Sequence, residues 1–207
     1  MSESNRLGSG DTLRLVDAIA AGEKPSSDWR IGTEYETFGL TPGTKAPLRY
    51  DGDQAPATVK GLLERLQTQL GWAPMYDGKA LIGIKSGYRS VQLEPSGQVE
   101  YSGPPVVTIR EAAQDITAFE AHKKRLTEEL GIQWLWSGFL PVHRRDTLDL
   151  MPKHRYGIMR KYLPTRGKLA AEMMQRTTTV QSNLDFGDET DMGHKLRTSM
   201  GFASILA

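Results

Sequence analysis

Cysteine is absent from this sequence of 207 residues. The absence excludes a disulfide framework, a thiolate nucleophile and a zinc site with sulfur ligands. A protein without disulfides fits a reducing compartment, and we expect this one in the cytoplasm. The polar N-terminus, MSESNRLGSGD, lacks the apolar core of a secretory signal, and no apolar run is long enough to cross a bilayer. We therefore expect a globular protein without a membrane partner.

An excess of one charge and the familiar nucleotide motifs are also missing. The chain has 26 basic and 25 acidic residues, and this near balance gives no support for a nucleic-acid partner. The patterns GxSxG, GxGxxG and the P-loop are absent, so a nucleotide site, if there is one, is not of the P-loop kind. The four histidines show no H-x-x-x-H spacing, and we interpret them as structural or surface residues.

Turn residues and apolar periodicity predict the fold class. The dipeptides at 77–78 (Asp-Gly) and 96–97 (Ser-Gly) each separate two short apolar runs, which is typical of β-hairpins. Apolar residues at helical spacing predict helices over about 56–70 and 108–130. Strands joined by tight hairpins and mixed with helices favour an α+β fold with a mainly antiparallel sheet over a doubly wound parallel sheet.

The sequence has no internal repeat and no low-complexity linker, so we expect a single domain over residues 1–207, with a flexible segment over residues 1–10. The segment WLWSGFL, residues 134–140, is predicted to be a buried strand. A first helix, ending near residue 21, is expected to bury one apolar stripe. Its members are Leu13, Leu15, Val16, Ile19 and Ala20.

Two glutamates interrupt the stretch RIGTEYETFGL, residues 30–40, which otherwise has the composition of a strand. Glu34 and Glu36 are two positions apart, so on a strand they lie on the same face, roughly 7 Å from each other. Like charges in this arrangement repel each other, and more strongly where the face is buried. The pair therefore needs either water or a compensating cation.

A second acidic group lies in the predicted hairpin RSVQLEPSGQVEYSG. Pairing across its turn is expected to bring Glu94 and Glu100 together, and both lie beside Glu34 and Glu36 if the two segments join one sheet. Four carboxylates in one concavity require cations, and oxygen ligands favour Mg²⁺ or Mn²⁺, which usually also hold phosphate. The alternative is a solvated sheet face, which is the more common reason for alternating glutamates.

The stretch TTTVQSNLDF, residues 177–186, predicts a strand with two different faces. One face carries Thr177, Thr179, Gln181, Asn183 and Asp185. Their amide and hydroxyl groups suit a carboxylate, an ammonium group or a sugar hydroxyl. The opposite face, which includes Val180 and Leu184, is expected to pack on the core. Arg176, just before the strand, is a candidate to hold a carboxylate through two hydrogen bonds. A sheet with one solvated face explains the same pattern.

Several basic residues are weaker candidates for phosphate contacts. They are Lys85, Arg89 and the run KHRYGIMRKYLPTRGK over residues 153–168. Such a run more often forms a solvated helix face.

Four segments, in this order and at these spacings, closely resemble the glutamate–cysteine ligases of the plant and proteobacterial type. They are IGTEYETFGL, SVQLEPSGQVEYSGPP, MPKHRYGIMRKYLP and AEMMQRTTTVQSNLDF, and the resemblance extends from about Trp29 to Ala207. It implies a carboxylate–amine ligase with a glutamine-synthetase-like fold, in which a curved, mainly antiparallel sheet flanked by helices forms a funnel.

The resemblance also implies a reaction, its substrates and its site. ATP, bound through Mg²⁺ or Mn²⁺, phosphorylates the side-chain carboxylate of L-glutamate, and the amine of L-cysteine then displaces phosphate to give γ-glutamylcysteine, the first step of glutathione synthesis. Carried onto the matching positions, the metal ligands are Glu34, Glu36, Glu94 and Glu100. Gln181 and Asn183 become contacts to glutamate or to metal-bound ATP phosphate, and Arg176 becomes a catalytic carboxylate anchor.

Members of this family are considerably longer than the present chain, and its last predicted helix is still apolar at residues 205–207. We therefore expect an incomplete sheet with an exposed apolar face, which favours association, including a homo-oligomer. Two alternatives stay open at this point. One is a truncated, inactive chain that binds a ligand or partner without turnover, and the other is a ligase with a different amine acceptor.

Overall fold

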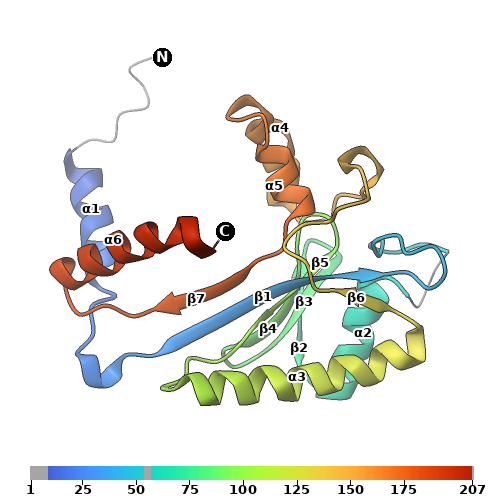
Figure 1. The fold of residues 1–207 in the computed structure, drawn as a ribbon, viewed down its shortest axis with the longest axis horizontal. Helices are drawn as coiled ribbons and strands as arrows, with labels where there is room; N and C mark the ends of the chain where they lie inside the picture. Colours follow the sequence, from blue (N-terminus) through green and yellow to red (C-terminus); the bar gives the residue numbers. More distant parts are fainter. Residues whose placement is uncertain (1–8, 54–56, 207) are drawn as a thin grey trace. The chain divides into compact units, whose positions relative to one another are not determined.

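A computed structural model of the chain describes residues 9–53 and 57–206, which divide into two compact units (Figure 1). The first unit is formed by residues 1–31 and 183–207, and the second by residues 32–182. Of the segment expected to be flexible, residues 1–8 lie outside the described residues, whereas the two that follow belong to a helix. The prediction of one domain over the whole chain stays a prediction.

Strands and helices are intermixed along the described residues. The strands are β1 (Ile31–Leu40), β2 (Ala73–Asp77), β3 (Ala80–Ser86), β4 (Arg89–Leu93), β5 (Gln98–Ser102), β6 (Gln133–Leu135) and β7 (Val180–Leu184). The α-helices are α1 (Ser9–Ala20), α2 (Val59–Leu70), α3 (Ile109–Leu130), α4 (His154–Tyr162), α5 (Ala170–Arg176) and α6 (Glu189–Leu206). Short 3₁₀ helices, η2, η3 and η4, lie at Ser26–Asp28, Arg145–Thr147 and Leu163–Thr165.

The strands form one sheet with the order β2-β3-β4-β5-β1-β6, and β7 also pairs with β1. The ladders between neighbours in this order are antiparallel. The prediction of an α+β fold with a mainly antiparallel sheet flanked by helices is therefore confirmed.

Both predicted hairpins form where the turn residues indicate. Gly78, with a φ of 59°, joins β2 to β3, and Gly97, with a φ of 92°, lies in the turn between β4 and β5. A Cβ atom at Gly97 would come within 2.7 Å of the carbonyl oxygen of Leu48. Only glycine satisfies both the positive φ and this close approach.

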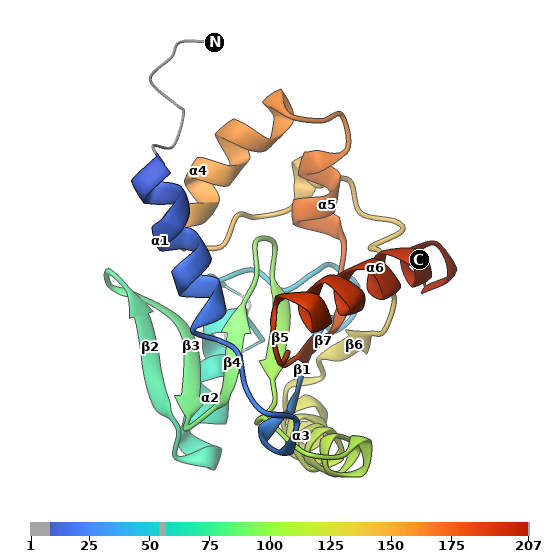
Figure 2. The ribbon, with the colours of Figure 1, turned by 90° about the vertical axis from the view of Figure 1, so that its left-hand side faces the viewer.

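The core lies between one face of the sheet and the helices α2 and α3 (Figure 2). The side chains of Tyr35 and Tyr101 point to this face from β1 and β5, and the Tyr101 ring stacks on Phe119 of α3 with 4.1 Å between ring centroids. Because side chains alternate along a strand, Glu36 and Glu100 point to the other face. Packing of Tyr35 and Tyr101 in the core thus determines that Glu36 and Glu100 lie on the face of the sheet opposite α2 and α3.

The helices α4 and α5 lie near the turn between β4 and β5. Tyr156 of α4 donates a hydrogen bond from its hydroxyl to the carbonyl oxygen of Leu93, at 3.1 Å. Gln98 of β5 donates from Nε2 to the carbonyl oxygen of Thr177, at 3.0 Å. These contacts attach the segment from 154 to 177 to the sheet.

The predicted burial is wrong for two strands. WLWSGFL contains only the last two residues of β6, and Trp136 is 58% exposed, because β6 pairs with only the end of β1 (Phe38–Leu40). The face of β7 that was expected to pack on the core is also exposed, with Val180 at 84%. Among the described residues, β7 contributes no side chain to the core cluster.

The first unit is held by polar contacts around Asp185. Lys24 binds its carboxylate at 2.7 Å, and the backbone N–H of Arg30 donates to it at 2.9 Å. Lys195 of α6 lies 3.4 Å from the centroid of the Trp29 ring. The apolar stripe predicted to be buried on α1 is exposed at Leu13, Leu15, Val16 and Ile19. No helix in the described ranges has both the length and the apolar content needed to cross a membrane.

The N-terminus of α3 provides a test of the fold. Thr108 accepts a hydrogen bond from the backbone N–H of Glu111, whose carboxylate accepts one from the backbone N–H of Thr108. We expect Thr108→Ala to lower the free energy of unfolding by about 1 kcal/mol in urea titrations, because a helix donor loses its partner. Thr117→Ala, in the middle of the same helix, is the control and should have little effect. Equal losses in both variants would contradict a capping role.

Candidate functional site

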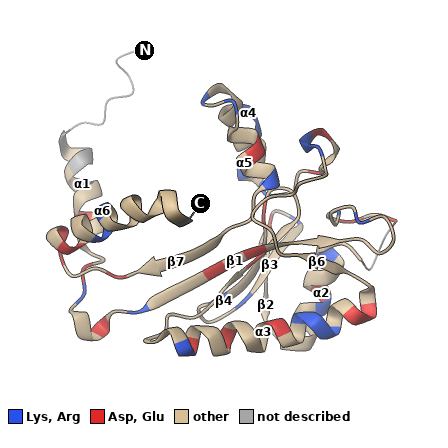
Figure 3. Cartoon of the chain, in the orientation of Figure 1, with Lys and Arg blue, Asp and Glu red and all other residues tan. Residues whose placement is uncertain are grey.

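Two of the predicted ligands lie directly opposite each other in the sheet. The register of β1 and β5 pairs Glu36 with Glu100, and the register of β4 and β5 pairs Gln92 with Glu100. Residues opposite each other on adjacent strands share a face, with their Cβ atoms roughly 5 Å apart. Gln92, Glu100 and Glu36 therefore form one row across three strands, and acidic residues interrupt β1 near its middle (Figure 3).

The other two predicted ligands flank this row. Glu34 lies opposite Ser102, two positions along β1 from Glu36, and Glu94 follows the end of β4, where its backbone N–H donates to the carbonyl oxygen of Gln98. The hairpin thus places Gln92, rather than Glu94, opposite Glu100. All four predicted metal ligands nevertheless share one face of the sheet by strand alternation.

Burial and like charges raise the pKa values of the two glutamates in this row. Burial, followed by the charges of Glu94 and Glu100, raises the pKa of Glu36 to about 7. Burial also raises the pKa of Glu100, with further contributions from Glu94 and Glu34. Hydrogen bonds to the ionised carboxylates offset part of this pKa rise. Thr179 donates to Glu36 at 3.2 Å, and Ser102 donates to Glu100 at 3.3 Å. The face therefore favours a positive ligand.

Two basic residues approach Glu94 from the start of α4. The Nζ atom of Lys153 lies 3.3 Å from Oε1 of Glu94, and Nη2 of Arg155 lies 3.5 Å from the same oxygen. Lys153 is only 7% exposed, and burial lowers its pKa. The sequence indicated this basic run as a candidate for phosphate contacts, but it gave no sign that Lys153 is buried beside an acidic residue.

The two weaker basic candidates lie on opposite faces. Lys85 is opposite Ser90, and Ser90 is opposite Ser102, so Lys85 shares the acidic face. Arg89 alternates with these residues and pairs with Asp115 of α3 at 2.6 Å. The structure therefore brings Lys85, but not Arg89, to the face with the glutamates.

The amide side chains predicted on β7 belong to different units. Gln181 donates from Nε2 to the Thr179 hydroxyl at 3.1 Å, and that hydroxyl donates to Glu36, so Gln181 is connected to the acidic row. Asn183 belongs to the first unit and has a partner of its own. Its role as a ligand contact stays a prediction.

Arg176, the predicted carboxylate anchor, lies at the end of α5 and is held by its neighbours. Its guanidinium donates to Glu172 at 2.9 Å and to the carbonyl oxygen of Leu140 at 2.8 Å, and it lies over the Phe139 ring with 4.3 Å to the centroid. Its Nε is buried and has no hydrogen-bond partner among the described residues. One donor of this guanidinium is therefore buried without a partner, and the role of Arg176 as a carboxylate anchor stays a prediction.

The acidic face has the donor chemistry of a Mg²⁺ or Mn²⁺ site. Its oxygen donors are carboxylates, which hard divalent cations prefer, and a cation would offset the burial and the like charges that raise the pKa of Glu36 and Glu100. Within residues 9–53 and 57–206, however, no group of three or more His, Asp or Glu side chains lies close enough to hold a metal. The four carboxylates share one face of the sheet without forming such a group, and their role as metal ligands stays a prediction.

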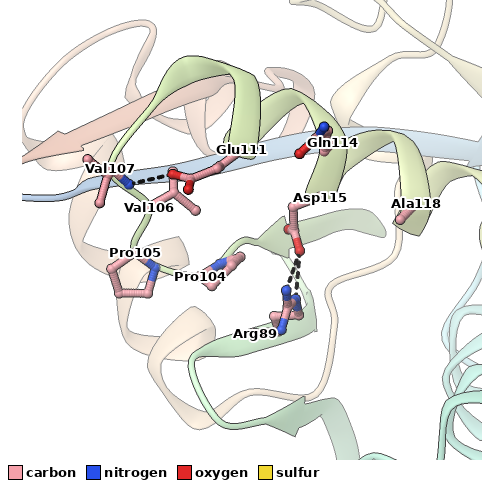
Figure 4. Close-up of a pocket in the computed structure, with 9 residues that line it drawn as sticks. All are labelled: Arg89, Pro104, Pro105, Val106, Val107, Glu111, Gln114, Asp115 and Ala118. Atoms are coloured by element: carbon pink, nitrogen blue, oxygen red, sulfur yellow. Dashed lines mark hydrogen bonds and ion pairs between the residues drawn. The ribbon is translucent and has the colours of Figure 1, made fainter.

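A cavity of about 480 Å³ lies on the other side of the sheet, beside α3 (Figure 4). Its walls include Pro104, Pro105 and Val107, and the ion pair of Arg89 with Asp115 lies at its edge. The charged groups of this pair neutralise each other, and Glu111 is bound to the N-terminus of α3. The cavity therefore offers less to a charged ligand than the acidic face does.

Comparisons with known proteins agree with the sequence resemblance. The model of the glutamate–cysteine ligase family 2 (GCS2) matches residues 30–207. The chloroplastic glutamate–cysteine ligase of Medicago truncatula is 40% identical over 191 residues, which cover 92% of this chain and 36% of the relative. The Arabidopsis thaliana ligase is 40% identical with 35% of its length covered, and ligase A of Oryza sativa subsp. japonica is 39% identical with 38% covered.

The chain thus spans a little over a third of the length of these curated relatives. Their names place them in the chloroplast, whereas the absence of cysteine led us to expect the cytoplasm for this chain. The expected location stays a prediction.

The raised pKa of Glu36 provides a pH-dependent test in the metal-free protein. Because this pKa rises from 4.5 to about 7 on folding, the folded state holds a proton that the unfolded state has lost, and stability falls as pH rises through this interval. We expect Glu36→Gln to match the wild type in free energy of unfolding near pH 4.5 and to exceed it at pH 8. Urea titrations across this range measure the difference.

The matched control is Glu64→Gln, on the exposed face of α2, where the nearest cation is Lys60 at 4.0 Å. Its difference from the wild type should not change in the same way with pH. If Glu36→Gln is less stable than the wild type at pH 8, the ionised carboxylate stabilises the fold through its contacts, and the interpretation of Glu36 as a metal ligand is contradicted.

Proposed function

Because the chain belongs to the glutamate–cysteine ligase family 2, we propose that it serves the ATP- and Mg²⁺-dependent ligation of L-glutamate to L-cysteine, the first step of glutathione synthesis. In this reaction an oxygen of the glutamate γ-carboxylate attacks the γ-phosphorus of ATP, and ADP leaves. The amine of cysteine then attacks the acyl carbon, the bond from carbon to the phosphate oxygen breaks, and the amine loses a proton. The products are γ-glutamylcysteine, ADP and phosphate.

The observation that carries this proposal is the row formed by Glu36 and Glu100. Two half-buried carboxylates opposite each other, with raised pKa values, are a poor arrangement for a sheet that only has to be stable, and a suitable one for binding a divalent cation. Glu34 and Glu94, on either side, complete the oxygen donors of the face. A metal held there would neutralise the charge that develops on the transferred phosphoryl group.

The remaining residues position these ligands. Thr179 orients Glu36 through its hydroxyl, and Gln181 supports that hydroxyl in turn. Ser102 orients Glu100 in the same way. Outer contacts of this kind commonly change metal affinity by about 10- to 100-fold when they are removed. Gln181 is therefore placed to tune the site even where it does not touch the substrate.

Nucleotide binding is the first test. We expect calorimetry to show ATP binding that requires Mg²⁺ or Mn²⁺, and we expect Glu36→Gln to weaken it at least about tenfold, since a direct ligand should matter no less than an outer contact. The control is again Glu64→Gln, which should bind like the wild type. ATP binding that is independent of divalent cations would contradict the proposed site.

Turnover is the second test, and it decides between the alternatives. ADP release is measured with L-glutamate, Mg²⁺ and ATP together with a panel of amines. We expect release to require both glutamate and an amine, with L-cysteine preferred. A preference for another amine would make the chain a ligase of different specificity. Metal-dependent ATP binding without ADP release from any amine would mean that it binds substrates without ligating them.

A further inference from the structure

Lys153 is a charged residue buried next to the acidic row. It immediately precedes α4, is 7% exposed, and its Nζ lies 3.3 Å from Oε1 of Glu94 and 3.5 Å from Oε1 of Gln92. A buried ammonium group is unfavourable unless acceptors compensate it. Gln92 is also the residue opposite Glu100, so Lys153 places its positive charge at the end of the row that contains Glu36.

The surroundings of Lys153 hold it there. Its Nζ lies 5.4 Å from the centroid of the Tyr156 ring, and the Tyr156 hydroxyl is hydrogen-bonded to the backbone of Leu93. Tyr156 is fully buried and attaches the first turn of α4 to β4. The lysine is therefore fixed by the same contact that fixes the helix, whereas an ordinary surface lysine is free to move.

A divalent cation and the Lys153 ammonium would compete for the same carboxylate. Both neutralise Glu94, and two cations in contact with one oxygen repel each other. An ammonium group that leaves Glu94 keeps three N–H donors, and the phosphate oxygens of a metal-bound nucleotide are strong acceptors for them. Exchange of this lysine from carboxylate to phosphate would leave both Lys153 and Glu94 with a partner of opposite charge before and after binding.

We propose that Lys153 neutralises Glu94 in the metal-free protein and becomes a phosphate-binding residue when the metal and ATP bind. This inference rests on the proposed function and deepens it, because it selects one residue from the basic run over residues 153–168 and assigns it a role both without and with the nucleotide. Lys153 thereby acts as an internal cation that holds the acidic face together until the metal arrives.

The experiment compares metal binding alone with nucleotide binding. Free Mn²⁺ is followed by electron paramagnetic resonance without nucleotide, Mg²⁺·ATP binding by calorimetry, and thermal unfolding in parallel. We expect Lys153→Met, which removes the charge but keeps most of the apolar stem, to bind Mn²⁺ alone several-fold more tightly and Mg²⁺·ATP about tenfold more weakly. Lys153→Arg should restore most of the affinity for the nucleotide, since it restores the charge.

The matched control is Lys124→Met, the same substitution on the exposed surface of α3, which should leave both affinities unchanged. A purely structural role for Lys153 would lower both affinities together with the melting temperature, and that result would overturn the proposal. Unchanged affinities in Lys153→Met would do the same. If Lys153→Met does not fold, Lys153→Gln, which keeps a donor beside Glu94, carries the same two measurements.

The outcome also separates this inference from the proposed function. If the wild-type chain shows no metal-dependent ATP binding, the proposed function and the nucleotide half of the inference are both overturned, and the Mn²⁺ measurement still decides whether Lys153 competes for the carboxylates. The wild type can instead bind Mg²⁺·ATP while Lys153→Met shows neither tighter Mn²⁺ binding nor weaker Mg²⁺·ATP binding. That result would overturn the inference about Lys153 and leave the proposed function standing.

Discussion

The half-burial of Glu36 and Glu100, which lie opposite each other on β1 and β5 close to Glu94, is the constraint on which the rest of the site depends. Burial, followed by the charge of Glu94, raises the pKa of both carboxyls and makes their ionised forms unfavourable without a nearby cation. The cost is offset on the opposite face of the same strands, where Tyr35 and Tyr101 pack against each other with 5.6 Å between ring centroids. One pair of strands thus carries both the packing that stabilises the sheet and the carboxylates of the proposed metal site.

Basic side chains of the protein itself partly neutralise the acidic face. Lys153 is buried against Glu94, and Arg155 approaches the same oxygen from a more exposed position. Their presence explains how the sheet tolerates its acidic face. In the proposed function, the same balance of charge would allow a nucleotide that carries its own divalent cation to approach a face that would otherwise repel phosphate.

Local signals allowed the sequence to predict much of the fold, whereas long-range packing was harder to predict. The hairpin turns at Gly78 and Gly97 and the helices α2 and α3 depend on neighbours in sequence, and these predictions are confirmed. The exposure of Val180 and Trp136 depends on which parts of the sheet the helices cover, and strand alternation contains no information on that. The family was predicted from four segments and is confirmed, while the roles of the individual ligands stay predictions. The burial of Lys153 could not be predicted, because a basic residue just before a helix has the same sequence pattern as a solvated basic run.

The account is tested most directly by locating a manganese ion in crystals of the chain grown with Mn²⁺ and a non-hydrolysable ATP analogue. Anomalous diffraction identifies the metal independently of any assumption about its ligands. The account requires a peak on the face of β1 and β5, in contact with carboxylate oxygens of both Glu36 and Glu100. A manganese ion bound elsewhere, with these two glutamates hydrated or paired only with protein groups, would contradict it.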